Sequence, residues 1–213
     1  MPTRSPKNAL AFKRSLLRWF RGHARDLPWR RTRDPYRILV SEIMLQQTQV
    51  SRVRDYYPRF LYRFPTLDAL ARARPRQVRE AWDGLGYYRR AENLHALART
   101  IMREADGNLP ADPERLQGLP GIGRYTAGAL ASFAFERRTA AVDTNVSRVL
   151  TRAFAPRNDV WSLAQRLLPT RPRVVWEFNQ ALMDLGATIC VARKPKCAVC
   201  PVRRACRTGA RAG

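Results

Sequence analysis

The sequence predicts an all-α fold. Apolar residues recur at helical spacing along most of the chain, as in Phe12, Leu16, Trp19 and Phe20. The segments that carry this spacing are separated by proline or glycine, which interrupt helices. No segment shows a convincing alternation of apolar and polar residues, and no Asn-Gly pair marks a hairpin between strands.

The first half of the chain reads as a series of helices. The first, residues 9–20, is followed by a break at residues 26–30. Asp34-Pro35 is typical of a helix start, because proline lacks an N–H group that the first helical turn leaves unpaired in any case. The helices expected after this break are residues 36–49, 53–64, 67–73, 76–85 and 89–105.

A glycine-rich stretch, residues 119–128, predicts a tight turn between two helices. Pro120 ends the first helix, and Gly121 and Gly123 allow backbone angles that a side chain disfavours. The next helix, from Thr126 to Phe135, would begin with unpaired N–H groups, which attract an anion such as a DNA phosphate. An ordinary helix–helix turn explains the same residues equally well.

Asp143 opens the next helix, where aspartate is a preferred N-cap residue. The last sizeable helices expected are residues 161–168 and 174–185. The length, 213 residues, suits one large domain or two small ones, and no internal repeat is visible.

The charge points to nucleic acid. Lys and Arg number 40 against 17 Asp and Glu, a net charge of +23, and only four of the 40 are lysines. An anionic membrane surface is less well supported, since the sequence has no basic amphipathic anchor and no apolar run of spanning length. The N-terminus lacks the apolar core of a signal peptide, so we expect an intracellular protein, in the cytoplasm or nucleoid of a bacterium.

All four cysteines fall within the last 24 residues of the chain: Cys190, Cys197, Cys200 and Cys206. In a reducing compartment this grouping predicts a metal site more readily than two disulfides. Four thiolates so close in sequence can hold one zinc ion or one iron–sulfur cubane, and their spacing alone does not distinguish the two. Free buried cysteines are the third alternative.

Several blocks resemble the signature motifs of MutY-type adenine DNA glycosylases of the endonuclease III superfamily, and the resemblance extends over nearly the whole chain. The blocks are residues 27–30, 41–50, 84–88, 119–123 and 183–187. The resemblance implies a six-helix barrel with a helix–hairpin–helix, residues 27–136. It also implies an iron–sulfur domain formed by residues 1–26 and 137–213, in which Cys190, Cys197, Cys200 and Cys206 hold a [4Fe–4S] cluster.

The resemblance also implies a division of labour between two carboxyl groups. Glu42 matches the general acid that protonates the purine, and burial on the apolar face of its helix would raise its pKa. Asp143 matches the carboxylate that stabilises the sugar cation, and Asn145 a neighbour that hydrogen-bonds in the site. Tyr125 stands where the bifunctional branch has a Schiff-base lysine. Because no lysine lies between Lys13 and Lys194, we expect a monofunctional hydrolase.

The implied partner is double-stranded DNA with a mismatched or damaged base, bound by a monomer. Gln47 and Tyr87 match residues that wedge into the duplex, and Gln46 is a weaker candidate for the same work. Arg30 matches a residue of the base pocket. Gly121, Gly123 and Thr126 match the phosphate-binding hairpin.

Other interpretations stay open. Glu42 could be a solvated helix residue, Asp143 an N-cap alone, and Tyr125 and Tyr87 packing residues. The chain ends seven residues after Cys206, so we expect it to lack the C-terminal domain with which adenine glycosylases recognise 8-oxoguanine. Short thymine or uracil mismatch glycosylases of the same superfamily are therefore an alternative, and a non-catalytic module that senses DNA damage is another.

Overall fold

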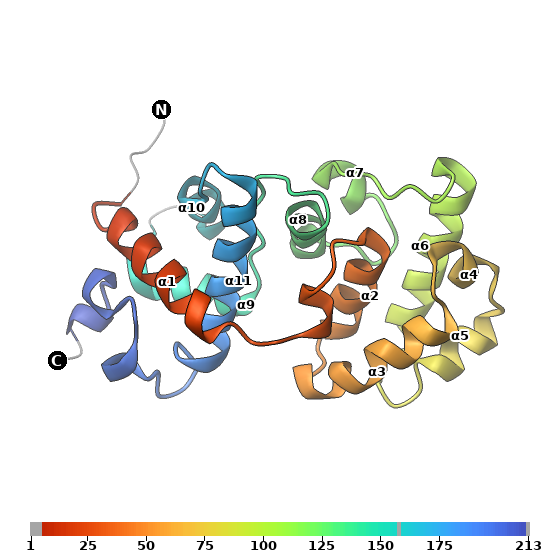
Figure 1. Cartoon of the computed structure of the whole chain (residues 1–213), viewed down its shortest axis with the longest axis horizontal. Helices are drawn as coiled ribbons and strands as arrows, with labels where there is room; N and C mark the ends of the chain where they lie inside the picture. Colours follow the sequence, from red (N-terminus) through yellow and green to blue (C-terminus); the bar gives the residue numbers. More distant parts are fainter. Residues whose placement is uncertain (1–5, 157–158, 212–213) are drawn as a thin grey trace. The chain divides into compact units, whose positions relative to one another are not determined.

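Helices supply all the regular secondary structure in the residues that the computed structural model describes, 6–156 and 159–211. No strand is present among these residues, so the all-α prediction is confirmed. The chain divides into two units, which we describe separately (Figure 1). Met1–Arg25 with Glu136–Gly213 form the first unit, and Asp26–Phe135 form the second.

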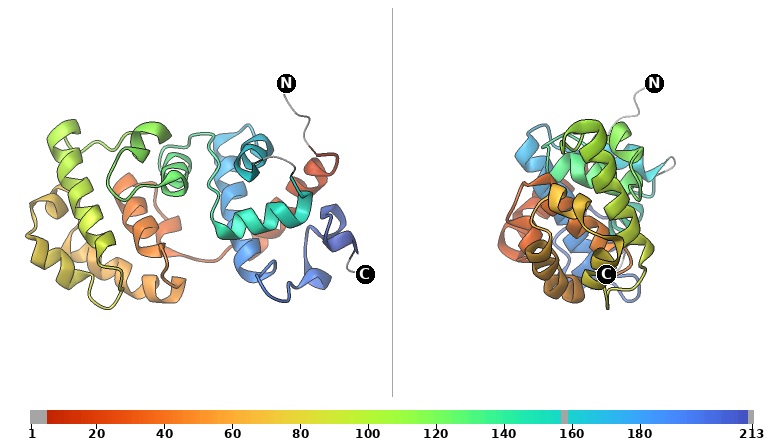
Figure 2. Two further views of the ribbon diagram at one scale, coloured as in Figure 1. Left: turned by 180° about the vertical axis from the view of Figure 1, so that it is seen from behind. Right: turned by 90° about the vertical axis from the view of Figure 1, so that its right-hand side faces the viewer.

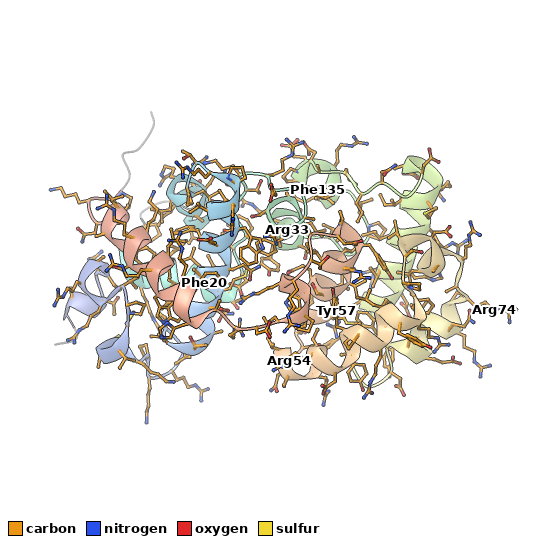
Figure 3. All side chains as sticks on the ribbon, viewed as in Figure 1. Phe20, Arg33, Arg54, Tyr57, Arg74 and Phe135 are labelled. Carbon is orange, nitrogen blue, oxygen red and sulfur yellow. The ribbon has the colours of Figure 1, made fainter. Side chains whose placement is uncertain are left out.

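The second unit has α6 as its long helix, packed against α4 and α5, while α2 packs against α3 and α8 (Figures 1 and 2). Its core is partly aromatic: the ring of Phe60 meets the ring of Trp82 edge-on at 5.7 Å. Tyr57 is buried within this unit, whereas Arg74 points into solvent (Figure 3). Its elements are η1 (Pro28–Arg30), α2 (Pro35–Leu45), α3 (Val50–Arg63), α4 (Leu67–Arg72), α5 (Pro75–Ala81), α6 (Arg89–Ala105), α7 (Pro113–Gln117) and α8 (Arg124–Phe133).

Helix α2 begins as predicted and ends earlier. Asp34 caps it, since its Oδ1 accepts a hydrogen bond from the backbone N–H of Arg37 at 2.8 Å. The helix ends at Leu45 rather than Gln49. Gln46 is extended and Gln47 has a φ of 56°, and neither conformation continues an α-helix. This early end produces a short loop between α2 and α3, which becomes part of the candidate site.

The first unit is organised around α11, which packs against α1 and α9. Its core includes Phe12, whose ring lies 5.0 Å from that of Phe154. Three short 3₁₀ helices follow α11 and carry the cysteine-rich segment. The elements of this unit are α1 (Ala9–His23), α9 (Thr144–Phe154), α10 (Val160–Leu167), α11 (Pro172–Thr188), η2 (Cys197–Val199), η3 (Arg203–Ala205) and η4 (Gly209–Arg211).

In the part of the chain that the structure describes, none of the helices combines the length and the apolar character needed to cross a lipid bilayer.

A buried ion pair fastens the end of the N-terminal segment to α11. Asp184 is fully buried, and its carboxylate accepts hydrogen bonds from the backbone N–H of Arg25 at 3.1 Å and from Nε of the same residue at 2.6 Å. The Arg25 side chain is itself only 30% exposed. Loss of this cation would remove a charged hydrogen-bond donor from a buried carboxylate, which is strongly destabilising.

We therefore expect Arg25→Ala to lower the free energy of unfolding by about 3 kcal/mol, measured by urea denaturation. Arg21→Ala is the matched control. Arg21 lies in the same N-terminal segment as Arg25 and pairs with Glu177 of α11, but the Arg21 side chain is 63% exposed. The control should cost about 1 kcal/mol or less. Equal losses for the two variants would contradict the role given to the buried pair.

Candidate functional site

The turn between α7 and α8 has the backbone geometry that its glycines predict. Gly121 has a φ of +76°, and a Cβ there would lie 2.8 Å from Cβ of Asn93, so this position requires glycine. Gly123 is the N-cap of α8, and a Cβ built on it would meet nothing within 4 Å. The space beside Gly123 leaves the first N–H groups of α8 accessible to a ligand.

Gln46 and Thr126 hold this turn against α2. Thr126 is only 2% exposed, and its Oγ1 accepts a hydrogen bond from Nε2 of Gln46 at 3.3 Å. The same amide lies 3.5 Å from the carbonyl oxygen of Gly121. The side chain of Thr126 therefore faces the protein, and only its backbone N–H in the first turn of α8 remains suited to an anion.

Glu42 lies in the last turns of α2 and is 4% exposed. Its helix is buried along most of its length, and the flanking Ser41 and Ile43 are buried as well. The carboxyl group is thus taken out of bulk water, in contrast to the solvated helix glutamate that sequence reasoning left open.

Asp143 has a different environment. It is half-buried and caps α9, since its Oδ1 accepts a hydrogen bond from the backbone N–H of Val146 at 2.6 Å. Its Oδ2 accepts a second hydrogen bond from Nδ2 of Asn145 at 2.9 Å. The expected N-cap is confirmed, and the two hydrogen bonds fix the position of both carboxylate oxygens at the start of α9.

Arg148 continues this network, and sequence reasoning missed it. Its Nη2 donates to Oδ1 of Asn145 at 2.7 Å and to the carbonyl oxygen of Gly186 at 2.8 Å. Its Nε donates to the carbonyl oxygen of Cys190 at 2.8 Å. Gly186 permits this close approach, because a Cβ there would lie 2.6 Å from Cβ of Asn145. With 36 arginines in the chain, no sequence signal distinguishes Arg148 from the others.

Tyr125 and Arg30 both belong to the second unit. Tyr125 lies half-buried in the first turn of α8, directly after the glycine turn. Arg30 is half-buried at the end of η1, next to Trp29, whose ring meets that of Tyr57 edge-on at 5.6 Å. Residues 26–135 contain no lysine, so this unit offers no side-chain amine for a Schiff base.

Gln47 and Tyr87 lie on two loops that line the same surface groove, with a volume of about 620 Å³. Both side chains are exposed, Tyr87 to 62%. Both residues also adopt the left-handed backbone conformation, with φ of 56° for Gln47 and 47° for Tyr87. An exposed aromatic ring on a strained loop contributes little to folding, and such features concentrate at binding sites. The packing role that sequence reasoning left open for Tyr87 does not fit this exposure.

The four cysteines line one cavity in the first unit and form no disulfide. A single zinc ion would hold its sulfur ligands about 2.3 Å away, hence within about 4 Å of one another. No group of three or more His, Cys, Asp or Glu side chains in the described ranges is arranged to hold one metal ion in this way. An iron–sulfur cubane binds each cysteine through a different iron atom, so it requires more widely spaced sulfurs in one shared cavity.

A hydrogen-bond donor lies beside each of two of these sulfurs. Sγ of Cys190 lies 3.5 Å from Nη1 of Arg152, and Sγ of Cys206 accepts a hydrogen bond from the backbone N–H of Gly209 at 3.3 Å. Burial raises the pKa of the Cys200 thiol to about 11 when no metal neutralises it. The donor set and its surroundings therefore fit a group that binds four thiolates.

Comparison with known proteins adds to this geometry. The family model described as "HhH-GPD superfamily base excision DNA repair protein" matches residues 40–168. The adenine DNA glycosylase of Rattus norvegicus is 47% identical over 222 residues, which cover 95% of this chain and 42% of the rat protein. That of Mycobacterium tuberculosis is 46% identical over 199 residues, 88% of this chain and 64% of the mycobacterial protein. The chain thus spans less than two thirds of either relative.

Two solved structures share the fold. A thermostable thymine-DNA glycosylase superposes with a TM-score of 0.90 at 32% identity, covering 96% of this chain and 98% of that one. A trapped complex of endonuclease III with DNA superposes with a TM-score of 0.83 at 24% identity, covering 98% of this chain and 99% of that one. The fold is therefore that of endonuclease III, and with the family match over residues 40–168 the chain belongs to the HhH-GPD superfamily of base excision DNA repair proteins.

Proposed function

We propose that the protein is a monofunctional DNA glycosylase that removes a mispaired adenine, opposite 8-oxoguanine or guanine, from double-stranded DNA. The observation that carries the proposal is the contrast between two carboxyl groups. Glu42 is buried in α2, whereas Asp143 is half-buried and accepts hydrogen bonds from a backbone N–H and from Asn145. Two carboxyl groups in different environments can take different roles, one as a proton donor and one as the carboxylate beside the sugar.

The two groups would act on one extruded nucleotide. Glu42 would give its proton to N7 of the adenine. The electrons of the C1′–N9 bond then pass to the purine, which leaves as neutral adenine. The ionised Asp143 would stabilise the positive charge on the sugar and orient a water molecule. The water oxygen bonds to C1′ and one of its protons passes to a carboxylate, so an abasic site remains.

Strand cleavage by a Schiff base is not part of this proposal. The second unit contains no lysine, and Tyr125 occupies the position where a related enzyme would need one. Tyr125 would instead order the pocket beside the sugar. The backbone of the product strand would stay intact until alkali breaks it.

DNA contact is assigned to two surfaces of the second unit. The glycine turn would bind a phosphate through Gly121, Gly123 and the first N–H groups of α8, without reading any base. Gln47 and Tyr87 would enter the duplex from their two loops, and Arg30 would assist recognition of the extruded base. The net charge of +23 supports binding to a polyanion. We propose that the protein acts as a monomer.

The cysteine cavity is proposed to hold a [4Fe–4S] cluster on Cys190, Cys197, Cys200 and Cys206. The cluster would act as a structural cross-link that fixes the C-terminal segment, and no step of base removal passes through it. Its binding fits four cysteines that form no disulfide and line one cavity. Basic residues border this segment and supply a further phosphate-contacting surface: Arg193, Lys194, Lys196, Arg203 and Arg204.

A thymine or uracil mismatch glycosylase is the second candidate. It is favoured by the structural similarity to the thymine-DNA glycosylase, with a TM-score of 0.90. Adenine ranks first because the adenine DNA glycosylases share 46–47% of the aligned residues, compared with 32% for the thymine enzyme.

A panel of labelled duplexes separates these candidates. With A·8-oxoguanine, A·G, T·G and U·G pairs, we expect alkali-dependent breaks at adenine in the first two duplexes only. Breaks confined to thymine or uracil would favour the second candidate and contradict the first. Breaks that form without alkali would contradict the monofunctional chemistry.

Glu42→Gln and Asp143→Asn should each lower the single-turnover rate of adenine release by about 10²–10⁴-fold, because each removes a charge or a proton that the reaction requires. Duplex affinity should stay within about threefold of wild type. Glu92→Gln is the matched control, since Glu92 is exposed on α6. Unchanged rates in both carboxylate variants, with binding intact, would support a non-catalytic DNA-binding module instead.

The cluster has a direct chemical test. Protein purified without oxygen should be brown and should contain about four iron atoms and four acid-labile sulfides per chain. Cys200→Ser should lose most of this iron and also lower the melting temperature, since the cross-link would be weakened. A colourless, active protein that contains zinc would refute the assignment.

A further inference from the structure

Arg90 is a buried cation that is surrounded by uncharged acceptors. It lies in the first turns of α6 and is 8% exposed. Within the described ranges, no carboxylate is a hydrogen-bond partner of its guanidinium group. These partners are the carbonyl oxygens of Ile43 (3.1 Å), Met44 (2.8 Å), Gln46, Leu85 (3.2 Å), Gly86 (3.1 Å) and Tyr87 (3.5 Å), and the hydroxyl of Thr48 (2.9 Å).

The acceptors belong to three backbone segments that have few other means of pairing. Ile43 and Met44 lie in the last turn of α2, where carbonyl groups have no partner within the helix. Gln46 and Thr48 belong to the loop after α2, and Leu85 and Gly86 to the loop before α6. A guanidinium group offers five N–H donors in a fixed plane, so one side chain can join all three segments.

The same two loops carry Gln47 and Tyr87. Each of these residues has a positive φ, which residues other than glycine seldom adopt, and each side chain is exposed. Their own packing therefore does little to fix them. Arg90 lies beneath them: its Cζ is 5.5 Å from the centre of the Tyr87 ring and 5.4 Å from that of the buried Trp82.

We propose that Arg90 is a positioning residue that preforms the duplex wedge, holding Gln47 and Tyr87 in place before DNA binds. The inference rests on the DNA contacts proposed above for those two residues. Arg90 is buried beneath the loops, so it acts through them. Arg90 also donates a hydrogen bond to the carbonyl oxygen of Ile43, the residue after Glu42. It therefore connects the wedge to the helix that carries the proposed general acid.

A double-mutant cycle distinguishes this role from support of the fold alone. Arg90→Lys keeps the positive charge but loses the planar set of donors, and it should raise the Kd for an A·8-oxoguanine duplex with an uncleavable adenine analogue about tenfold. In the background Gln47→Ala/Tyr87→Ala the same substitution should change Kd less than about twofold, because the groups through which Arg90 acts are gone. Arg89→Lys, at the exposed neighbouring position, is the matched control and should change Kd less than about twofold in either background.

Thr48→Val provides a second route if Arg90→Lys does not fold. It removes one acceptor of Arg90 and keeps the size of the side chain, so it should raise Kd by a smaller factor, again only when Gln47 and Tyr87 are present. An equal rise in both backgrounds would overturn the positioning role. If instead Gln47→Ala/Tyr87→Ala binds the duplex as wild type does, the proposed DNA contacts themselves are wrong, while adenine release assigned to Glu42 and Asp143 is unaffected.

Discussion

The chemistry proposed for this protein depends on one physical constraint: two carboxyl groups must differ in protonation at the same pH. The structure gives the two groups different local environments. Helix α2 removes Glu42 from water, and the first turn of α9 supplies Asp143 with a backbone N–H and the amide of Asn145. One carboxyl group is thus withdrawn from water inside its helix, and the other is held by two donors at the start of a helix.

Arginine recurs as the residue that holds irregular backbone in place. Arg90 joins the end of α2 to two loops, and Arg148 connects Asn145 with the carbonyl oxygens of Gly186 and Cys190. In both cases most acceptors are carbonyl groups that lack partners within regular structure. A planar group with five donors suits this work better than a lysine ammonium, with three donors on a flexible stem. Part of the arginine excess is thus architectural and does not face a polyanion.

Sequence reasoning predicted the helical fold and several helix starts, because these depend on local chemistry. The caps at Asp34 and Asp143 and the need for glycine at position 121 follow from a few adjacent residues. The early end of α2 did not follow, since the carbonyl groups there are bonded by Arg90, which lies 45 residues beyond Leu45 in the sequence. Similarly, the burial of the Thr126 side chain against Gln46 depends on packing between α2 and α8. Long-range contacts of this kind leave no local signature.

The most direct test of the central claim is a crystal structure of the protein with a duplex that holds an uncleavable, fluorinated adenine nucleotide opposite 8-oxoguanine. The account predicts that the adenine is extruded, with its N7 within about 2.6–3.2 Å of the Glu42 carboxyl group and with the Asp143 carboxylate beside C1′ of the same nucleotide. An extruded base that contacts neither carboxyl group, or an adenine that remains stacked in the duplex, would contradict it.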